Sequence, residues 1–279
     1  MAFWINVLKF LDTEMTKPTL YGWFHIVSLI LIVLCTVAVC VSHKRSKDPD
    51  KRVWLTVFIT AIAVFILEIY KQINYSFSYA DGSIAFDYQW YAFPWQFCST
   101  PMYIGLLAGI IRKGKIHESL CAYLATFAIF AGAAVMLYPN TIYISTVGIN
   151  IQTTVCHGSM IVVGIYLLYS GYVKLEHKTI LKALPVFAAM TGVAVILNEI
   201  AHSTGLLETD TFNMFFISPY CEPSLPVYSL VQGVIPFPWC LVLYILGFTA
   251  AAYLMLLLAM AVRKVAKSFQ KTNRELTKV

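Results

Sequence analysis

Long apolar runs separated by short polar connections dominate this chain of 279 residues. Seven runs have the ~17–25 residues that a helix needs to cross the hydrocarbon core, and a helix satisfies its own backbone hydrogen bonds there. The pattern therefore predicts an all-α membrane protein with seven transmembrane helices. The expected spans cover residues 22–41, 53–75, 95–111, 119–138, 153–172, 180–202 and 239–262.

The two ends differ from these spans. Residues 2–11 are apolar but too short to cross a bilayer, and they lack the basic region and cleavage site of a signal peptide. Aromatic residues there, Phe3, Trp4 and Phe10, suit the membrane–water interface. We expect a single membrane domain with an interfacial segment at 1–18, a seven-helix bundle at 19–262 and a basic cytoplasmic tail at 263–279.

Composition supports a polytopic membrane protein: 59% of residues are hydrophobic, 12% are charged, and the mean hydropathy is +0.72. The net charge of +6 lies mostly in short connections, so no nucleic-acid partner is expected. Seven cysteines form no C-x-x-C pair, which favours neither a disulfide framework nor a metal site. No cofactor is indicated.

Charge placement predicts the orientation. Lys and Arg number five, three and three in the first, third and fifth connections and six in the tail, against three on the other side. The positive-inside rule then puts the N-terminus outside and the C-terminus in the cytoplasm. The long sixth connection, residues 203–238, is expected to fold over the outer mouth. The missing signal peptide and compact loops favour the bacterial inner (plasma) membrane.

Two proline-containing segments predict the starts of membrane-spanning helices. Matches between the spans also suggest an internal repeat. Residues 93–101 are FPWQFCSTP and residues 237–240 are FPWC, each with a proline suited to a helix start. These segments match at an offset of 144, Glu68 and Glu199 match at 131, and His25 and His157 match at 132. The sequence therefore suggests a parallel 3+1+3 pseudo-repeat.

Polar residues within the spans are candidates for a site in the outer-leaflet half. Glu68, Lys71 and Gln72 fall on one helix face, because their spacing is i, i+3 and i+4. A second cluster consists of Asn198, Glu199 and His202. A charge facing lipid costs at least ~2.5 kcal/mol, so both faces should point inward. For each group a purely structural role, such as a Glu68–Lys71 ion pair, is the alternative.

Cys98 is the candidate nucleophile and His157 its candidate base. A neutral thiol needs a base to become nucleophilic, so Cys98 becomes a catalytic candidate only if His157 lies within hydrogen-bonding reach. A cysteine without that contact is more often a packed thiol. Gly158 follows His157 and allows a close approach by a helix or a ligand.

The order of these features resembles the YwaF-like bacterial integral membrane proteins. The resemblance rests on the polar mouth 94–98, on His157-Gly158, on the segment NMFF at 213–216, and on PSL at 223–225 and PW at 238–239. It implies a distant relationship to an animal acyltransferase that moves polyunsaturated acyl chains onto ether lysophospholipids. It further implies that Cys98 accepts the acyl group, that His157 is its base, and that Asn213 belongs to the substrate-binding residues.

One departure from the animal pattern concerns the cysteine. There the cysteine directly follows the proline and precedes a histidine, whereas Trp95 and Gln96 hold those places here. A shift of three residues is nearly one helical turn, so Cys98 is expected to face the same cavity about 4–5 Å lower.

Three functional hypotheses follow. The first is a lipid-active enzyme for acyl transfer or acyl hydrolysis, acting on a membrane lipid or acyl donor, with Gln96 or Asn198 donating to the oxyanion. The second is a small-solute or lipid transporter or binding protein with Glu68 and Glu199 on opposite walls of a polar cavity. The third is a structural or sensory protein. The cytoplasmic halves of the spans are nearly free of polar residues, which favours a one-sided site.

Overall fold

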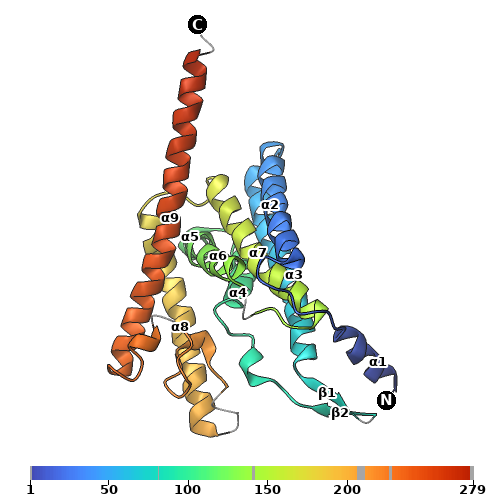
Figure 1. The fold of residues 1–279 in the computed structure, drawn as a ribbon. Helices are drawn as coiled ribbons and strands as arrows, with labels where there is room; N and C mark the ends of the chain where they lie inside the picture. Colours follow the sequence, from blue (N-terminus) through green and yellow to red (C-terminus); the bar gives the residue numbers. More distant parts are fainter. Residues whose placement is uncertain (1, 81, 140–141, 206–210, 226–227, 277–279) are drawn as a thin grey trace.

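The computed structural model describes residues 2–80, 82–139, 142–205, 211–225 and 228–276, and most of them are helical (Figure 1). Within this part, six helices are long and apolar enough to cross a membrane. This confirms a helical membrane fold. The six are α2 (Trp23–Lys44), α3 (Pro49–Asn74), the continuous helix Gly114–Leu137, α7 (Val147–Tyr169), α8 (Lys178–Thr204) and α9 (Phe237–Leu276).

The span expected at residues 95–111 is shorter than predicted. Helix α4 covers only Thr100–Ile110, and a series of turns precedes it. The amides of Ser99 and Thr100 both bond to the Gln96 carbonyl, and Pro101 lies in the first helical turn, where a proline costs no hydrogen bond. At 1.5 Å per residue, eleven residues reach about 16 Å, short of the ~30 Å core. Seven membrane-spanning helices are therefore not confirmed.

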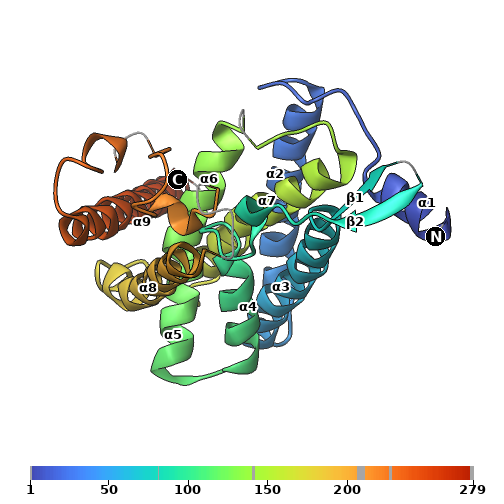
Figure 2. The same cartoon turned by 90° about the horizontal axis from the view of Figure 1, so that it is seen from below.

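One helix crosses the middle of the bundle. It consists of α5 (Gly114–Tyr123), a π-helical turn η2 (Leu124–Ala128) and α6 (Ile129–Leu137). Figure 1 shows this helix almost end-on, whereas Figure 2, turned by 90°, shows it along its length. Its axis is therefore strongly inclined to the axes of α2 and α9. Its most apolar window is 72% buried, against 17% for α2. The crossing helix forms the centre of the core.

Close packing around this helix depends on glycine. A Cβ on Gly132 of α6 would lie 2.5 Å from the backbone carbonyl of His157 in α7. A Cβ on Gly164 of α7 would meet the Ile129 side chain. Small residues let helix backbones approach in this way.

The N-terminal segment and a hairpin lie together at one end. Helix α1 (Ala2–Leu11) packs near the end of α3 and near β1 (Phe77–Ala80), which pairs antiparallel with β2 (Ser83–Phe86). The Tyr70 hydroxyl donates to the Leu11 carbonyl at 2.6 Å, and Glu14 forms a β-bridge with Thr146. These contacts fasten the start of the chain to α3 and α7.

The sixth connection folds back into the bundle. Its short helix η3 (Met214–Phe216) places Met214 and Phe215 among fully buried side chains, and the Phe215 ring lies tilted against the rings of Phe97 and Phe187. A second short helix, η4 (Tyr228–Leu230), follows before α9. The connection is therefore part of the core. Residues 206–210 and 226–227 of this connection lie outside the described residues.

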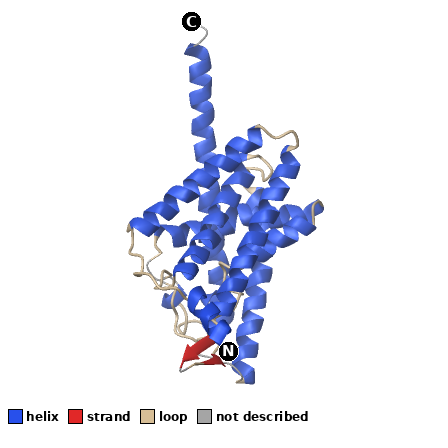
Figure 3. Cartoon of the chain, turned by 90° about the vertical axis from the view of Figure 1, so that its right-hand side faces the viewer, coloured by secondary structure: helices blue, strands red, loops and turns tan. Residues whose placement is uncertain are grey.

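The tail expected at residues 263–279 continues the last span. Helix α9 runs unbroken to Leu276, and its C-terminal part projects beyond the rest of the bundle (Figure 3). The described part of the tail is therefore helical.

Candidate functional site

The buried carboxylate of Glu68 is the centre of the main polar site. Its side chain, on the inner face of α3, is only 5% exposed. Lys71 Nζ lies 2.7 Å from Glu68 Oε1, and Gln72 Nε2 donates to the same oxygen at 2.8 Å. The helical spacing predicted that these three residues share a face, and the structure brings them together.

Gln152 of α7 completes this site and was missed by the sequence analysis. Its amide donates to Glu68 Oε2 at 3.2 Å, so both carboxylate oxygens have a partner. Gln152, Cys156 and Ser159 recur at i, i+4 and i+7, which is the helical signal that could have identified this face. Such additional hydrogen bonds are what a buried ion pair needs to offset its desolvation.

The segment after the hairpin covers the site. Tyr88 donates to the Gln72 side-chain oxygen, and Gln72 donates in turn to the Ala92 carbonyl at 2.9 Å. Burial, together with the nearby charge of Glu68, raises the pKa of Tyr88 to about 12. The phenol therefore stays a hydrogen-bond donor throughout the physiological range.

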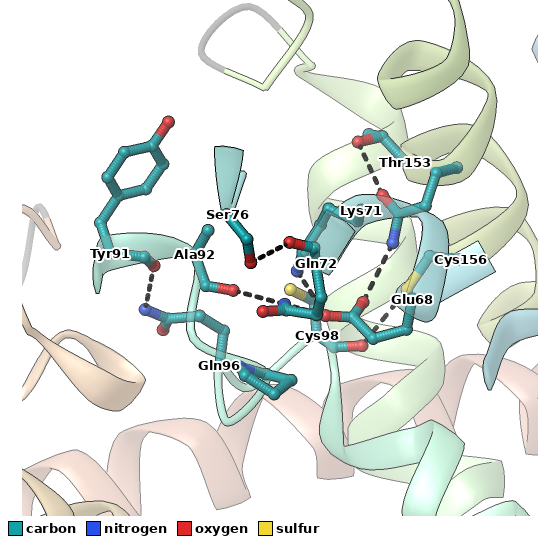
Figure 4. Close-up of polar contacts among 12 residues, drawn as sticks. Glu68, Lys71, Gln72, Ser76, Tyr91, Ala92, Gln96, Cys98, Thr153 and Cys156 are labelled. Atoms are coloured by element: carbon teal, nitrogen blue, oxygen red, sulfur yellow. Dashed lines mark hydrogen bonds and ion pairs between the residues drawn. The ribbon is translucent and has the colours of Figure 1, made fainter. Parts of the chain in front are cut away.

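Cys98 lies beside this network, in the turn before α4 (Figure 4). The residue has intermediate exposure, and Lys71 and Glu68 lie beside it in Figure 4. Its carbonyl accepts a hydrogen bond from Cys156 Sγ at 3.4 Å. The helical shift of about one turn expected between residue 95 and Cys98 is wrong, because these residues form turns and α4 begins only at Thr100.

His157 has different neighbours. Its ring is buried, Nδ1 donates to the Thr153 carbonyl at 2.8 Å, and its backbone packs against Gly132. It follows Cys156 by one residue, about 100° around the helix. Both His157 and Cys98 are in the described part of the chain, and no hydrogen bond joins the imidazole to the thiol there.

A small apolar cavity of about 30 Å³ lies between α3, α4, α7 and η2, and Cys98 and Cys156 are among its lining residues. Its walls are mostly apolar, and the side chains with a hydroxyl or a thiol are Thr60, Cys98, Cys156 and Ser159. This volume holds about one or two water-sized groups. The apolar members include Val57, Val64, Met102, Leu124, Met160 and Val163.

The candidates Gln96, Asn198 and Asn213 hold the sixth connection in place. Asn198 donates to the Met214 carbonyl at 3.0 Å and accepts from its amide at 2.8 Å. Gln96 donates to the Asn213 carbonyl at 3.1 Å and accepts from the Phe215 amide at 3.2 Å. Asn213 Oδ1 accepts from the Ser218 amide at 2.9 Å. The two amides expected to donate to an oxyanion are therefore engaged with the backbone.

Glu199 and His202 lie apart from the Glu68 site. Both are exposed; Tyr220 donates to the Glu199 carboxylate at 2.8 Å and stacks on His202 with 3.4 Å between ring centroids. Glu68 and Glu199 thus belong to separate networks. His25, the supposed counterpart of His157, is buried and contacts the Met136 carbonyl at 2.8 Å. The matched positions have different surroundings, and the repeat is not confirmed.

No group of three or more His, Cys, Asp or Glu side chains among the described residues is arranged to hold a metal ion.

One known protein family matches the part of the chain that contains the whole candidate site. A family model matches residues 20–258, which include every candidate residue. The chain belongs to the TMEM164 family. No curated protein and no solved structure matches it. Membership of the TMEM164 family, a membrane family, agrees with the apolar helical fold. The YwaF-like resemblance and the relationship to an acyltransferase remain predictions, as does the membrane in which the protein resides.

Proposed function

We propose that this protein is a lipid-active membrane enzyme that transfers acyl groups through the Cys98 thiol, with Glu68 as the proton acceptor in place of His157. The observation that carries the proposal is the position of Cys98, a residue of intermediate exposure, beside the buried Glu68–Lys71 ion pair (Figure 4). Reactive cysteines typically lie in such partly exposed surroundings next to a lysine.

The ion pair can support the chemistry of thiol acylation. The thiol proton passes to the Glu68 carboxylate, and the Lys71 ammonium stabilises the thiolate that remains. The thiolate attacks the carbonyl carbon of a lipid ester, the ester C–O bond breaks, and the leaving oxygen takes the proton from Glu68. The product is an acyl thioester on Cys98 and a lysolipid.

The second half of the reaction reverses these roles. The hydroxyl of an acceptor lysophospholipid gives its proton to Glu68 and attacks the thioester carbonyl. The C–S bond breaks, and the thiolate recovers the proton from Glu68. Lys71 is the cation nearest to the developing oxyanion in this scheme, since the Gln96 and Asn198 amides already bind backbone groups.

The apolar cavity supports a lipid substrate over a polar solute, because its walls are mostly aliphatic. At about 30 Å³ it is far smaller than an acyl chain, so α3, α4 and α7 would have to move apart to admit one. The transporter hypothesis has less support, since it needs Glu68 and Glu199 across one cavity and they lie in separate networks.

The test is acyl exchange by the purified full-length chain in liposomes that contain a labelled phospholipid and a lysophospholipid. Transfer should fall at least 100-fold in Cys98→Ala, and mass spectrometry should find an acyl group on the Cys98 peptide of the wild type. Cys40→Ala is the matched control, because Cys40 has the same intermediate exposure as Cys98 and does not line the cavity; it should keep most of the activity. Unchanged transfer in Cys98→Ala would overturn the proposal.

A further inference from the structure

A second cavity, of about 340 Å³, lies away from the Cys98 site, where α7 ends and α5 and α8 begin. Its lining is strongly charged. Four cationic side chains against two carboxylates leave an excess of two positive charges. The cations are Arg112, Lys113, Lys174 and Lys182, and the carboxylates are Glu118 and Glu176.

Two of the four cations already have partners. Lys182 forms an ion pair with Glu118 at 2.8 Å, and the Arg112 guanidinium lies 4.0 Å from the centre of the Trp54 ring. Lys113 and Lys174 form no ion pair within the described residues. The excess positive charge is therefore available at these two ammonium groups.

One residue that lines the cavity has a buried ring nitrogen without a partner in the described part of the chain. His117 is 5% exposed, and its Nε2 lies 2.8 Å from the Tyr172 hydroxyl and 3.5 Å from the Cys121 thiol. In the tautomer in which Nε2 accepts from the Tyr172 hydroxyl, the ring hydrogen is on Nδ1. Nδ1 has no partner in the described part of the chain. A buried donor left in this state is destabilising until an acceptor binds.

The start of α5 adds backbone donors to the same cavity. Gly114 has a φ of 91°, and Lys113, at the N-cap, gives no side-chain hydrogen bond to the first turn. The first amides of a helix lack partners within the helix and favour an anion. The lysines, the His117 donor and these amides therefore all favour a negatively charged oxygen ligand.

We propose that this cavity is a phosphate-binding site. Its ligand is the phosphate group of an anionic lipid headgroup or of a soluble phosphate, since both present the same charged oxygens. The charge-assisted bonds from Lys113 and Lys174 supply most of the affinity. The site is independent of the thiol chemistry proposed for Cys98.

The experiment is a titration of the purified full-length protein in detergent with two probes, dihexanoyl phosphatidic acid and inorganic phosphate. Lys113→Gln and Lys174→Gln should each weaken binding about tenfold, as expected for loss of one charged hydrogen bond. Lys115→Gln is the matched control. It removes the same charge from the same helical turn, but Lys115 does not line the cavity, so binding should change less than about twofold.

The two probes distinguish the source of the phosphate. Tighter binding of dihexanoyl phosphatidic acid supports a lipid headgroup site, and equal affinities support a soluble phosphate. Absence of binding by both probes would overturn the proposal. The proposal would also be overturned if Lys113→Gln and Lys174→Gln bound no more weakly than Lys115→Gln.

Discussion

At the scale of single residues, burial distinguishes two carboxylates that occupy matched positions in the sequence. Glu68 has partners on α3 and α7 and almost no exposure, whereas Glu199 is exposed and bonds to Tyr220. A buried ion pair is costly to break, because the remaining charge is left without compensation, and an exposed pair contributes little. The same substitution should therefore have different effects at the two sites.

Glu68→Gln should lower the free energy of unfolding by roughly 3 kcal/mol. Breaking a buried ion pair typically costs about 3–5 kcal/mol. The lower value is expected here, because 13% of the Lys71 side chain is exposed and keeps some contact with solvent. Glu199→Gln, the matched control, should change this free energy by less than about 1 kcal/mol. Unfolding in mixed detergent micelles measures both. Equal losses in the two variants would contradict the assignment of Glu68 as the buried centre.

At the scale of elements, the fit between helices decides the architecture. The crossing helix formed by α5, η2 and α6 packs against α7 through Gly132, whereas Gly192 of α8 has no atom within 4 Å of its would-be Cβ. A methyl group at Gly132 must push the backbones of α6 and α7 apart, whereas a methyl group at Gly192 meets open space.

Gly132→Ala should therefore destabilise the protein by about 1–3 kcal/mol, the usual cost of overpacking. Gly192→Ala should leave stability unchanged or raise it by up to about 1 kcal/mol, because alanine is the better helix former. Chemical unfolding of the two variants beside the wild type provides the measurement. A neutral Gly132→Ala would show that α6 and α7 do not approach as closely as the structure has them.

At the scale of the whole molecule, the polar and basic features lie in two regions. The Glu68 site lies near the hairpin and α1, and the proposed phosphate site lies where α5 and α8 begin. The distribution of Lys and Arg predicts that the second region faces the cytoplasm. The proposed acyl chemistry would then act in the outer leaflet and the phosphate site in the inner one.

Epitope tags test this orientation. A tag inserted at Ser83, in the hairpin, should bind antibody on intact cells, and a tag after Val279 should bind only after the membrane is permeabilised. A tag at Ser46, between α2 and α3, is the second inside control. The reverse pattern would place the N-terminus in the cytoplasm and would put the Glu68 site in the inner leaflet.

The sequence by itself determined the membrane class, the approximate positions of six long helices and the shared face of Glu68, Lys71 and Gln72. Hydropathy and helical periodicity are local properties, so neighbouring residues suffice to predict them. It did not predict the late start of α4, because the turn at Gln96 replaces helix that the apolar run would allow.

Only the tertiary structure decided which distant residues meet. It brought Gln152 to Glu68 across 84 positions and Cys98 to the Glu68–Lys71 pair, and it gave Glu199 a separate partner. It also gave Cys98 and His157 different neighbours. Such contacts depend on how far each helix is rotated and tilted against the next, and this is set by side-chain fit across the bundle, which spacing along the chain does not encode.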